Sequence, residues 1–380
     1  MGADERALSL GIIDSPLARR IGVRRSLALW SISPDCAVPD QKSGCQARGI
    51  LFGFKRLSIN ISPKKFLVTG GAGFIGSHLS EALVSAGHEL VILDDFNDYY
   101  DPAVKENNLA SLRGKVEIVR GDISDDAVVV ETFTRHRFDG VFHLAARAGV
   151  RPSIANPRLY FNTNMDGTLN LLEACRHHGV KFFVFASSSS VYGVNTKVPF
   201  SETDLIARTI SPYAATKLAG EQMCSNYAHL FGLRCMCLRF FTVYGPRQRP
   251  DLAISKFTSA LLAGRAIDRY GDGSTARDYT YVDDIVRGIL AAADYTEKSS
   301  FEIFNLGGAA TTTLNELIGM VESGIGTKAE IRQLPDQPGD VPRTYADVTK
   351  AERLLGYHPQ TAIREGITKY VEWQRSSQVV

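Results

Sequence analysis

Residues 64–76, which read KKFLVTGGAGFIG, constrain the fold of this chain more than any other stretch. They open with the apolar run 66–68, typical of a buried parallel strand. Three glycines at three-residue spacing follow it, Gly70, Gly73 and Gly76, and a helical pattern near 75–86 comes next. This order predicts a dinucleotide site, because glycines let the backbone approach a pyrophosphate and the helix N-terminus offers free N–H groups. The alternative is a structural glycine turn in another α/β protein.

A carboxylate after the next apolar run indicates which dinucleotide is bound. Residues 90–93 are predicted to be the second strand, and Asp94 ends it roughly 20 residues after the glycines. A carboxylate at this position accepts hydrogen bonds from the ribose hydroxyls of NAD. Because no Arg follows Asp94 closely to hold a 2′-phosphate, we predict NAD rather than NADP as the cofactor.

Composition and charge narrow the class of protein. A hydrophobic fraction of 44% with 22% charged residues is ordinary for a globular protein, and a net charge of +2 argues against nucleic acid as a partner. Six cysteines make no disulfide framework in a chain of 380 residues, and we expect reduced thiols and no metal site. No apolar run is long enough for a membrane helix, so we expect a cytoplasmic protein without a membrane partner.

The basic excess of the chain lies in residues 1–62, which hold nine Lys and Arg against five Asp and Glu. Scattered Pro, Gly, Ser and Arg favour a disordered N-terminal extension there. A transit peptide is a weaker alternative, because such peptides avoid the acidic residues found in this segment.

Strand and helix patterns alternate from residue 64 onward, which predicts an α/β fold with a Rossmann-type, doubly wound parallel sheet. The expected strands are 66–69, 90–93, 116–119, 141–144, 182–186 and 235–239, and the expected helices lie near 75–86, 125–136, 162–178 and 212–230. The alternation stops after residue 246, although a helix near 282–293 and a strand near 302–306 return to the sheet. We therefore predict an NAD-binding domain made of 63–244 and 281–307, and a smaller α/β substrate-binding lobe made of 245–280 and 308–380.

Ligands of such sheets bind at the carboxyl ends of the strands, so the residues that follow each strand are candidates for the site. Asp122 and Ile123 follow the third predicted strand, and Ala145 and Ala146 follow the fourth. Four serines at 187–190 follow the fifth. A serine run is often only a polar loop, but its place beside the predicted cofactor favours a functional role here.

Tyr213 and Lys217 stand four residues apart at the start of a predicted helix, where they face the same side. A free phenol has a pKa of about 10, too high for a base at neutral pH. A nearby ammonium, helped by the oxidised nicotinamide, would lower that pKa and make Tyr213 a general base. Tyr and Lys at this spacing are common on protein surfaces, so the prediction depends on the NAD fold around them.

These motifs together resemble the extended short-chain dehydrogenase/reductase family. The shared motifs are TGGAGFIG at 69–76, the serines before VYG at 191–193, and Tyr213 with Lys217. RFFTVYGP at 239–246 and RDY at 277–279 are similar to its nucleotide-sugar branch. Within that branch the chain most resembles UDP-glucuronate 4-epimerases, in four segments: 94–101, 144–151, 337–342 and 344–347. Arg147 departs from their usual pattern.

The resemblance implies an isomerase that uses NAD to epimerise C4 of a UDP-sugar, with UDP-glucuronate converted to UDP-galacturonate. Ser188 would hydrogen-bond the C4 oxygen, and Tyr213, assisted by Lys217, would remove the C4 hydroxyl proton as hydride leaves for NAD. The implied cofactor-binding residues are Gly70, Gly73, Phe74, Ile75, Gly76, Asp94, Asn97, Asp122, Ile123, Leu144, Ala145, Ala146, Asn164, Tyr213, Lys217 and Phe240. The implied substrate-binding residues are Arg151, Ser188, Ser189, Ser190, Thr242, Arg249, Arg277, Gln337 and Asp340.

The serine run separates this chain from relatives with other activities. Dehydratases of the family carry Asp-Glu where Ser189 and Ser190 stand, and UDP-glucuronate decarboxylases usually carry Glu in place of Ser190. With neither acid, the chain is expected to oxidise and reduce C4 without elimination. The serines and Thr242 offer hydroxyls for a C6 carboxylate, and Arg249 and Arg277 offer forked donors for the diphosphate.

Other interpretations of the same residues stay open. The acid-free serine run also fits a UDP-glucose or UDP-N-acetylglucosamine 4-epimerase, and a protein that only senses NAD would keep the same fold. Gln337 and Asp340 could simply shape a turn. The helices 162–178 and 212–230 resemble those that pair in dimers of the family, which implies a homodimer.

Overall fold

The computed structural model, which describes residues 63–335 and 341–377, contains one large parallel β-sheet. The strand order is β11-β6-β5-β4-β1-β2-β3, and every neighbouring pair is parallel. The strands are β1 (Lys65–Thr69), β2 (Glu89–Asp94), β3 (Glu117–Arg120), β4 (Gly140–His143), β5 (Phe182–Ser188), β6 (Arg234–Phe240) and β11 (Phe301–Leu306). All the predicted strands of the sheet are present, which confirms the doubly wound α/β fold.

Some predicted features lie outside the described residues. These are the N-terminal extension 1–62 and the two residues Gln337 and Asp340. Their roles stay predictions, and so does the division of the chain into two domains at the predicted boundaries.

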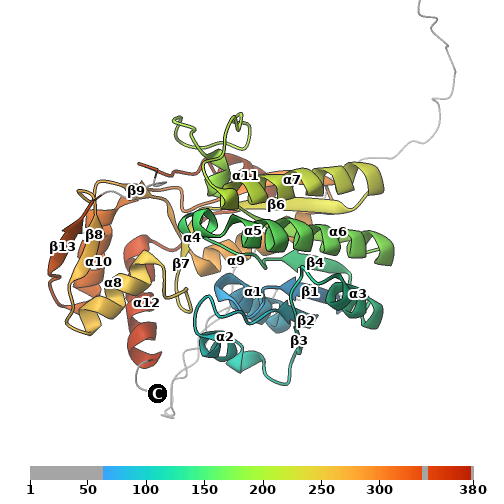
Figure 1. Ribbon diagram of the computed structural model, residues 1–380, viewed down its shortest axis with the longest axis horizontal. Helices are drawn as coiled ribbons and strands as arrows, with labels where there is room; N and C mark the ends of the chain where they lie inside the picture. The colour runs from blue at the N-terminus through green and yellow to red at the C-terminus, as the bar shows by residue number, and fades with distance from the viewer. Residues whose placement is uncertain (1–62, 336–340, 378–380) are drawn as a thin grey trace, which may run out of the picture. The chain divides into compact units, whose positions relative to one another are not determined.

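Side chains of the strands alternate between the two faces of the sheet, and helices cover both faces (Figure 1). Phe66 and Val68 of β1 belong to the core under α1 and α9, whereas Leu67 belongs to the core under α3, α6 and α7. The bounds of these helices are α1 (Phe74–Ser85), α3 (Asp126–Arg135), α6 (Gly167–His178), α7 (Pro212–Phe231) and α9 (Val282–Tyr295). Because both faces are buried, the strands are continuous apolar runs rather than alternating ones.

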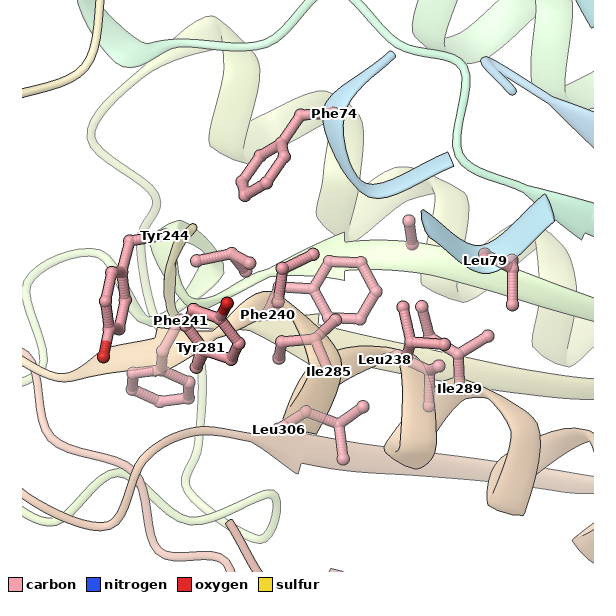
Figure 2. Packing of buried hydrophobic residues seen from close by; sticks show 14 of the residues in the cluster. Phe74, Leu79, Leu238, Phe240, Phe241, Tyr244, Tyr281, Ile285, Ile289 and Leu306 are labelled. Carbon is pink, nitrogen blue, oxygen red and sulfur yellow. The ribbon is translucent and has the colours of Figure 1, made fainter. Parts of the chain in front are cut away.

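Figure 2 shows the core under α1 and α9 at close range. Leu238 and Phe240 of β6 lie beside Ile285 and Ile289 of α9, with Leu79 of α1 nearby. Each of these side chains is buried, and burial of one such side chain is worth about 1.5–3 kcal/mol. This core therefore holds α1, and with it the glycine turn, against the sheet.

Several short helices were not predicted. They are α2 (Pro102–Asn108), η1 (Ala110–Leu112), α4 (Val150–Ala155), α5 (Pro157–Phe161) and η3 (Ser189–Tyr192). Three of them begin at side-chain caps rather than along a hydrophobic repeat: Asp101 accepts from the Ala103 N–H, Asn156 from the Leu159 N–H, and Ser188 from the Ser190 N–H. The predicted helix 162–178 also begins differently, as the π-helical turn η2 (Asn162–Asp166) that continues into α6.

Beyond β7, the elements α8, β8, α10, β13 and α12 lie together beside the large sheet (Figure 1). α8 and α12 both pack against α10, and β13 pairs with β8, whereas α11 packs against α9 and β11. The bounds are β7 (Thr242–Tyr244), α8 (Ala253–Leu262), β8 (Ile267–Tyr270), β9 (Ala276–Arg277), β10 (Tyr279–Tyr281), β12 (Thr312–Thr313), α10 (Leu314–Ile325), β13 (Ile331–Leu334), α11 (Thr349–Leu355) and α12 (Ile363–Ser377). Within the described residues, no helix combines the length and apolar character needed to span a bilayer.

Candidate active site

The glycine turn after β1 forms a tight cradle that side chains would fill. Gly70 has φ +69°, in the left-handed region, and a Cβ there would lie 2.7 Å from the backbone N of Ala145. A Cβ on Gly76 would lie 2.1 Å from the carbonyl O of Gly70. Since helix α1 begins at Phe74, its N-terminus and this turn can present backbone N–H groups to an anion. The cradle fits the pyrophosphate of a dinucleotide.

A cavity of about 730 Å³ opens at the carboxyl ends of the strands, beside this cradle. Its volume is in the range of small-molecule and cofactor sites. Most of the predicted site residues line it: Gly70, Gly73, Phe74, Ile75, Gly76, Asp94, Asn97, Asp122, Ile123, Leu144, Ala145, Ala146, Ser188, Ser189, Tyr213, Lys217, Phe240, Thr242 and Arg249. The structure thus brings the predicted cofactor and catalytic residues around one space, and whether each contacts a ligand stays a prediction.

Asp94 ends β2 inside this cavity and is fixed by the backbone. Its carboxylate accepts from the N–H of Ala72 at 3.1 Å and of Phe96 at 2.9 Å. The Nζ of Lys105 lies 3.5 Å away, a buried partner that the sequence did not indicate. Burial raises the pKa of Asp94, while Lys105 and the two N–H groups act in the opposite direction. The carboxylate is held in one orientation where ribose hydroxyls are expected.

Four other described residues predicted for the site lie outside the cavity lining. Asn164 donates from Nδ2 to Thr216 Oγ1 and to the carbonyl O of Arg147, each at 3.0 Å, and accepts from the Arg147 N–H at 2.8 Å. Asn164 therefore holds the loop after β4. The other three are Arg151, whose guanidinium lies over the Tyr270 ring, Arg277, which donates to the Ala276 carbonyl, and Ser190.

Ser188 and Tyr213 meet at the wall of the cavity. Ser188 ends β5, and its Oγ accepts from the backbone N of Ser190 at 3.2 Å and from the Ser190 hydroxyl at 2.9 Å. Tyr213 stands in the first turn of α7, which Ser211 caps by accepting from the Ala214 N–H at 3.1 Å. Burial raises the pKa of Tyr213, and the hydrogen bond with Ser188 and the charge of Arg249 offset part of this rise.

Lys217 is buried one turn further along α7. Its ammonium donates to the carbonyl O of Ala186 at 2.7 Å and lies 5.0 Å from the centre of the Phe185 ring. Burial lowers the pKa of Lys217 to about 8. The sequence predicted that Lys217, helped by the oxidised nicotinamide, lowers the pKa of Tyr213, and this stays a prediction. The phenol is desolvated, and the groups that lower its pKa are Ser188 and Arg249.

A buried ion pair behind this wall was missed by the sequence analysis. Arg239 donates to both carboxylate oxygens of Glu221, at 2.9 and 2.8 Å, and the Ser187 hydroxyl donates to the same carboxylate at 2.5 Å. Glu221 lies one turn beyond Lys217 on α7, and Arg239 lies on β6. The pair ties β5, β6 and α7 together where Ser188 leaves β5. Its one sequence signal was a charge inside the apolar strand.

The carboxylates that line the cavity lie at the ends of β2 and β3, whereas the serines lie at the end of β5, on the other side of β4 and β1 in the sheet. The carboxylates are Asp94, which ends β2, Asp95 and Asp98, which follow β2, and Asp122, which follows β3. The serine side offers hydroxyls of Ser188, Ser189 and Thr242 instead. Arg249 also lines the cavity, where its guanidinium donates to both oxygens of Asp251 at 2.9 and 2.8 Å. Among the described residues, no cluster of His, Cys, Asp and Glu could hold a metal ion.

A dinucleotide cradle with a Ser, Tyr and Lys beside it defines a Rossmann-type protein of the short-chain dehydrogenase/reductase class. Residues 67–370 match the sequence profile of GDP-mannose 4,6 dehydratase. UDP-glucuronate 4-epimerase 4 of Arabidopsis thaliana is 45% identical over 328 residues, which cover 82% of this chain and 75% of that relative. The chain belongs to the GDP-mannose 4,6-dehydratase family of extended short-chain dehydrogenases/reductases.

Solved structures of similar proteins include two sugar-nucleotide epimerases. UDP-glucuronic acid 4-epimerase of Bacillus cereus, in complex with UDP-glucuronic acid and NAD, has 36% identity and a TM-score of 0.77, covering 82% of this chain and 99% of that one. UDP-glucose 4-epimerase of Thermotoga maritima, with UDP-glucose, has 37% identity and a TM-score of 0.77, covering 83% and 99%.

Proposed function

We propose that this protein is an NAD-dependent UDP-sugar 4-epimerase and that it converts UDP-glucuronate to UDP-galacturonate. The observation that carries the proposal is the wall of the cavity, where Ser188 and Tyr213 meet beside Lys217 with hydroxyls and no carboxylate next to them. The names of the relatives support it, since one similar structure holds both UDP-glucuronic acid and NAD.

The residues present fit the cofactor. The cradle around Gly70 and Gly76 and the N-terminus of α1 would hold the pyrophosphate, Asp94 would accept from ribose hydroxyls, and Ile123 would border the adenine. When bound, NAD would supply the hydride acceptor for C4 of the sugar and, in its reduced form, the hydride donor.

The protein itself has to move one proton and hold the sugar. Tyr213 would take the proton of the C4 hydroxyl, and Ser188, which shares a hydrogen bond with the phenol, would orient the C4 oxygen. Burial alone disfavours the phenolate, so the positive charge of Arg249 and the ammonium of Lys217 are needed nearby when the phenol ionises.

The acid-free wall explains why a member of a family named for dehydration would epimerise. Elimination or loss of a carboxylate is helped by a carboxyl group placed beside the sugar, and here Ser189 and Ser190 stand instead. Oxidation at C4 of UDP-glucuronate gives a β-keto acid, which loses CO2 readily. The hydroxyls of Ser188, Ser189 and Thr242 would hold the carboxylate by hydrogen bonds until the hydride returns.

The test is an assay of the purified full chain against a panel of UDP-sugars, with products separated and identified. We expect UDP-glucuronate to give UDP-galacturonate with little pentose product. Interconversion of UDP-glucose and UDP-galactose, with UDP-glucuronate left unchanged, would support the first alternative. Binding of NAD without turnover of any sugar would support an NAD-sensing protein.

We also propose that two copies pair through the helices 162–178 and 212–230. Large apolar side chains are exposed on these helices and on the adjoining α5: Phe161, Leu169, Leu230 and Phe231. An exposed group of this kind marks an interaction surface. Light scattering should give the mass of a dimer for the wild type and of a monomer for Leu169→Glu. The cytoplasm is the proposed location, supported by the four described cysteines, which are free thiols.

A further inference from the structure

Arg147 makes a contact across the cavity that the sequence did not indicate. Its Nη2 lies 2.8 Å from Oδ2 of Asp95 and 3.9 Å from Oδ2 of Asp122. Arg147 follows β4, Asp95 follows β2 and Asp122 follows β3. All three residues line the cavity, so this contact joins loops that come from three different strands.

The strand order places the Arg147–Asp95 ion pair over the glycine turn. β1 lies between β4 and β2 in the sheet (Figure 1). Gly70 opens the turn directly after β1. The loop after β4 runs close beside this turn, because a Cβ on Gly70 would touch Ala145. Two strand spacings, about 10 Å, separate β4 from β2. A side chain that joins their loops therefore crosses the carboxyl end of β1, where the pyrophosphate is expected.

Both ends of this bridge are fixed by other contacts. On one side, the side-chain amide of Asn164 pairs with the backbone N–H and C=O of Arg147 at 2.8 and 3.0 Å. On the other side, Oδ1 of Asp95 accepts from the backbone N of Asn97 at 3.1 Å and from its Nδ2 at 2.6 Å, and Lys105 lies 3.6 Å away. The second oxygen of Asp95 is thereby presented to Arg147, and little further ordering is needed to form the pair.

The ion pair is also shielded from solvent. The side chains of Arg147 and Asp95 are 16% and 22% exposed, so salt screens this pair less than it screens the surface pairs. The Nε of Arg147 is buried without a hydrogen-bond partner, so the guanidinium keeps one donor unused in this position. A charge-assisted bond in such a place resists opening.

We propose that Arg147 and Asp95 form a clasp that retains NAD in the cavity. The inference rests on the proposed function, since it takes NAD as the resident cofactor. The dinucleotide lies between the glycine turn and the ion pair, and it leaves only when the pair opens. Asn164, predicted from the sequence as a cofactor ligand, acts in this view by fixing Arg147. Retention suits an enzyme that regenerates its cofactor in every turnover.

The test measures how fast NAD leaves the loaded protein, with released NAD quantified by chromatography after dilution into an enzyme trap. Arg147→Met and Asp95→Asn should each release NAD about tenfold faster than the wild type, which is about 1.4 kcal/mol. The double variant should release it no faster than either single variant, because both remove the same pair. Asn at position 95 keeps an oxygen for the Asn97 N–H. The matched control is Arg135→Met, which removes an exposed pair with Glu117 outside the cavity lining and should keep the wild-type rate.

Four results would count against the clasp. If Arg147→Met releases NAD at the wild-type rate, while its melting temperature shows a folded protein, the ion pair does not retain the cofactor. If Arg147→Met is fast but Asp95→Asn is not, Arg147 acts on the cofactor directly and no clasp exists. Additive effects in the double variant would overturn it for the same reason. A wild type that binds no NAD would overturn the proposed function and, with it, this inference.

Discussion

The two sides of the cavity, one at the ends of β2 and β3 and the other at the end of β5, differ in how their charged groups are stabilised. On the side of β2 and β3, Asp94, Asp95 and Asp122 each lie near a cation: Lys105 contacts Asp94 and Asp95, and Arg147 contacts Asp95 and Asp122. On the side of β5, no carboxylate lines the wall, and desolvation moves the pKa of the buried groups. Pairing suits the task of holding a cofactor, because the charges stay fixed. Desolvation lowers the pKa of the Lys217 ammonium to about 8 and raises the pKa of the Tyr213 phenol, so the phenol ionises only when a ligand or a positive charge beside it stabilises the phenolate.

The largest effect is expected from a substitution that alters only the side of β5, where proton transfer is proposed. Tyr213→Phe removes the phenolic oxygen next to Ser188 and leaves the cradle and the paired charges unchanged. Turnover of UDP-glucuronate should fall by about 10² or more, the usual loss for a positioned acid/base group, while bound NAD stays at the wild-type amount. Steady-state rates and the NAD content of the denatured protein are the measurements. Tyr295→Phe on α9 is the control, and near-normal turnover in Tyr213→Phe would remove Tyr213 as the base.

The second prediction concerns the cost of burying Lys217. Its pKa is lowered by burial from 10.5 to about 8, so the unfolded chain binds more protons than the folded one between these values. Stability therefore rises with pH across this window, and the contribution of Lys217 corresponds to about 3 kcal/mol. Denaturant unfolding at pH 8 and pH 10.5 should show the wild type gaining this amount relative to Lys217→Met. Equal gains in both proteins would show that the ammonium is not desolvated.

The strands and helices on both sides of the cavity were largely predictable, because they depend on patterns within short stretches of sequence. Buried parallel strands are short apolar runs, and Gly70 and Gly76 stand where any Cβ would collide with backbone. Tyr213 and Lys217 were predicted to face the same side because they stand four residues, about one helical turn, apart on α7. Each of these features is encoded within a few residues of sequence.

The partners that were missed are far apart in the chain. Arg147 and Asp95 are separated by 52 residues, and Arg239 and Glu221 by 18, and each pair forms only when different strands and helices pack. Sequence spacing carries no signal for such pairs. Lys105 was missed for another reason: α2 is short and begins at the Asp101 cap, so it showed no hydrophobic repeat. The sign of the shift in the pKa of Tyr213 likewise depends on burial by distant segments.

The third prediction introduces a carboxylate on the side of β5, whose cavity lining has none. Ser190→Glu should repel the C6 carboxylate of UDP-glucuronate, since the Ser190 hydroxyl bonds Ser188 at 2.9 Å. Epimerisation should fall about tenfold, and the share of pentose product should rise. Product ratios measured by chromatography test this. Ser190→Gln is the matched control for size, and an equal loss in both variants would show that bulk rather than charge is responsible.

The smallest expected effect removes a charge from the paired side. Asp94 should discriminate against NADP, because its carboxylate would meet the 2′-phosphate, but Lys105 at 3.5 Å already balances part of its charge. Asp94→Asn should therefore raise the affinity for NADP relative to NAD by about tenfold or less, since one backbone N–H bond is weakened for either cofactor. Calorimetric Kd values for the two cofactors give the ratio. Asp98→Asn removes another carboxylate from the lining. Comparing the two variants shows whether the ratio of Kd values depends on Asp94 itself or on the net charge of the lining. If the wild type prefers NADP, Asp94 at the end of β2 does not set the cofactor choice. If Asp94→Asn and Asp98→Asn change the ratio of Kd values equally, the cofactor choice depends on the total negative charge of the lining and not on the position of Asp94.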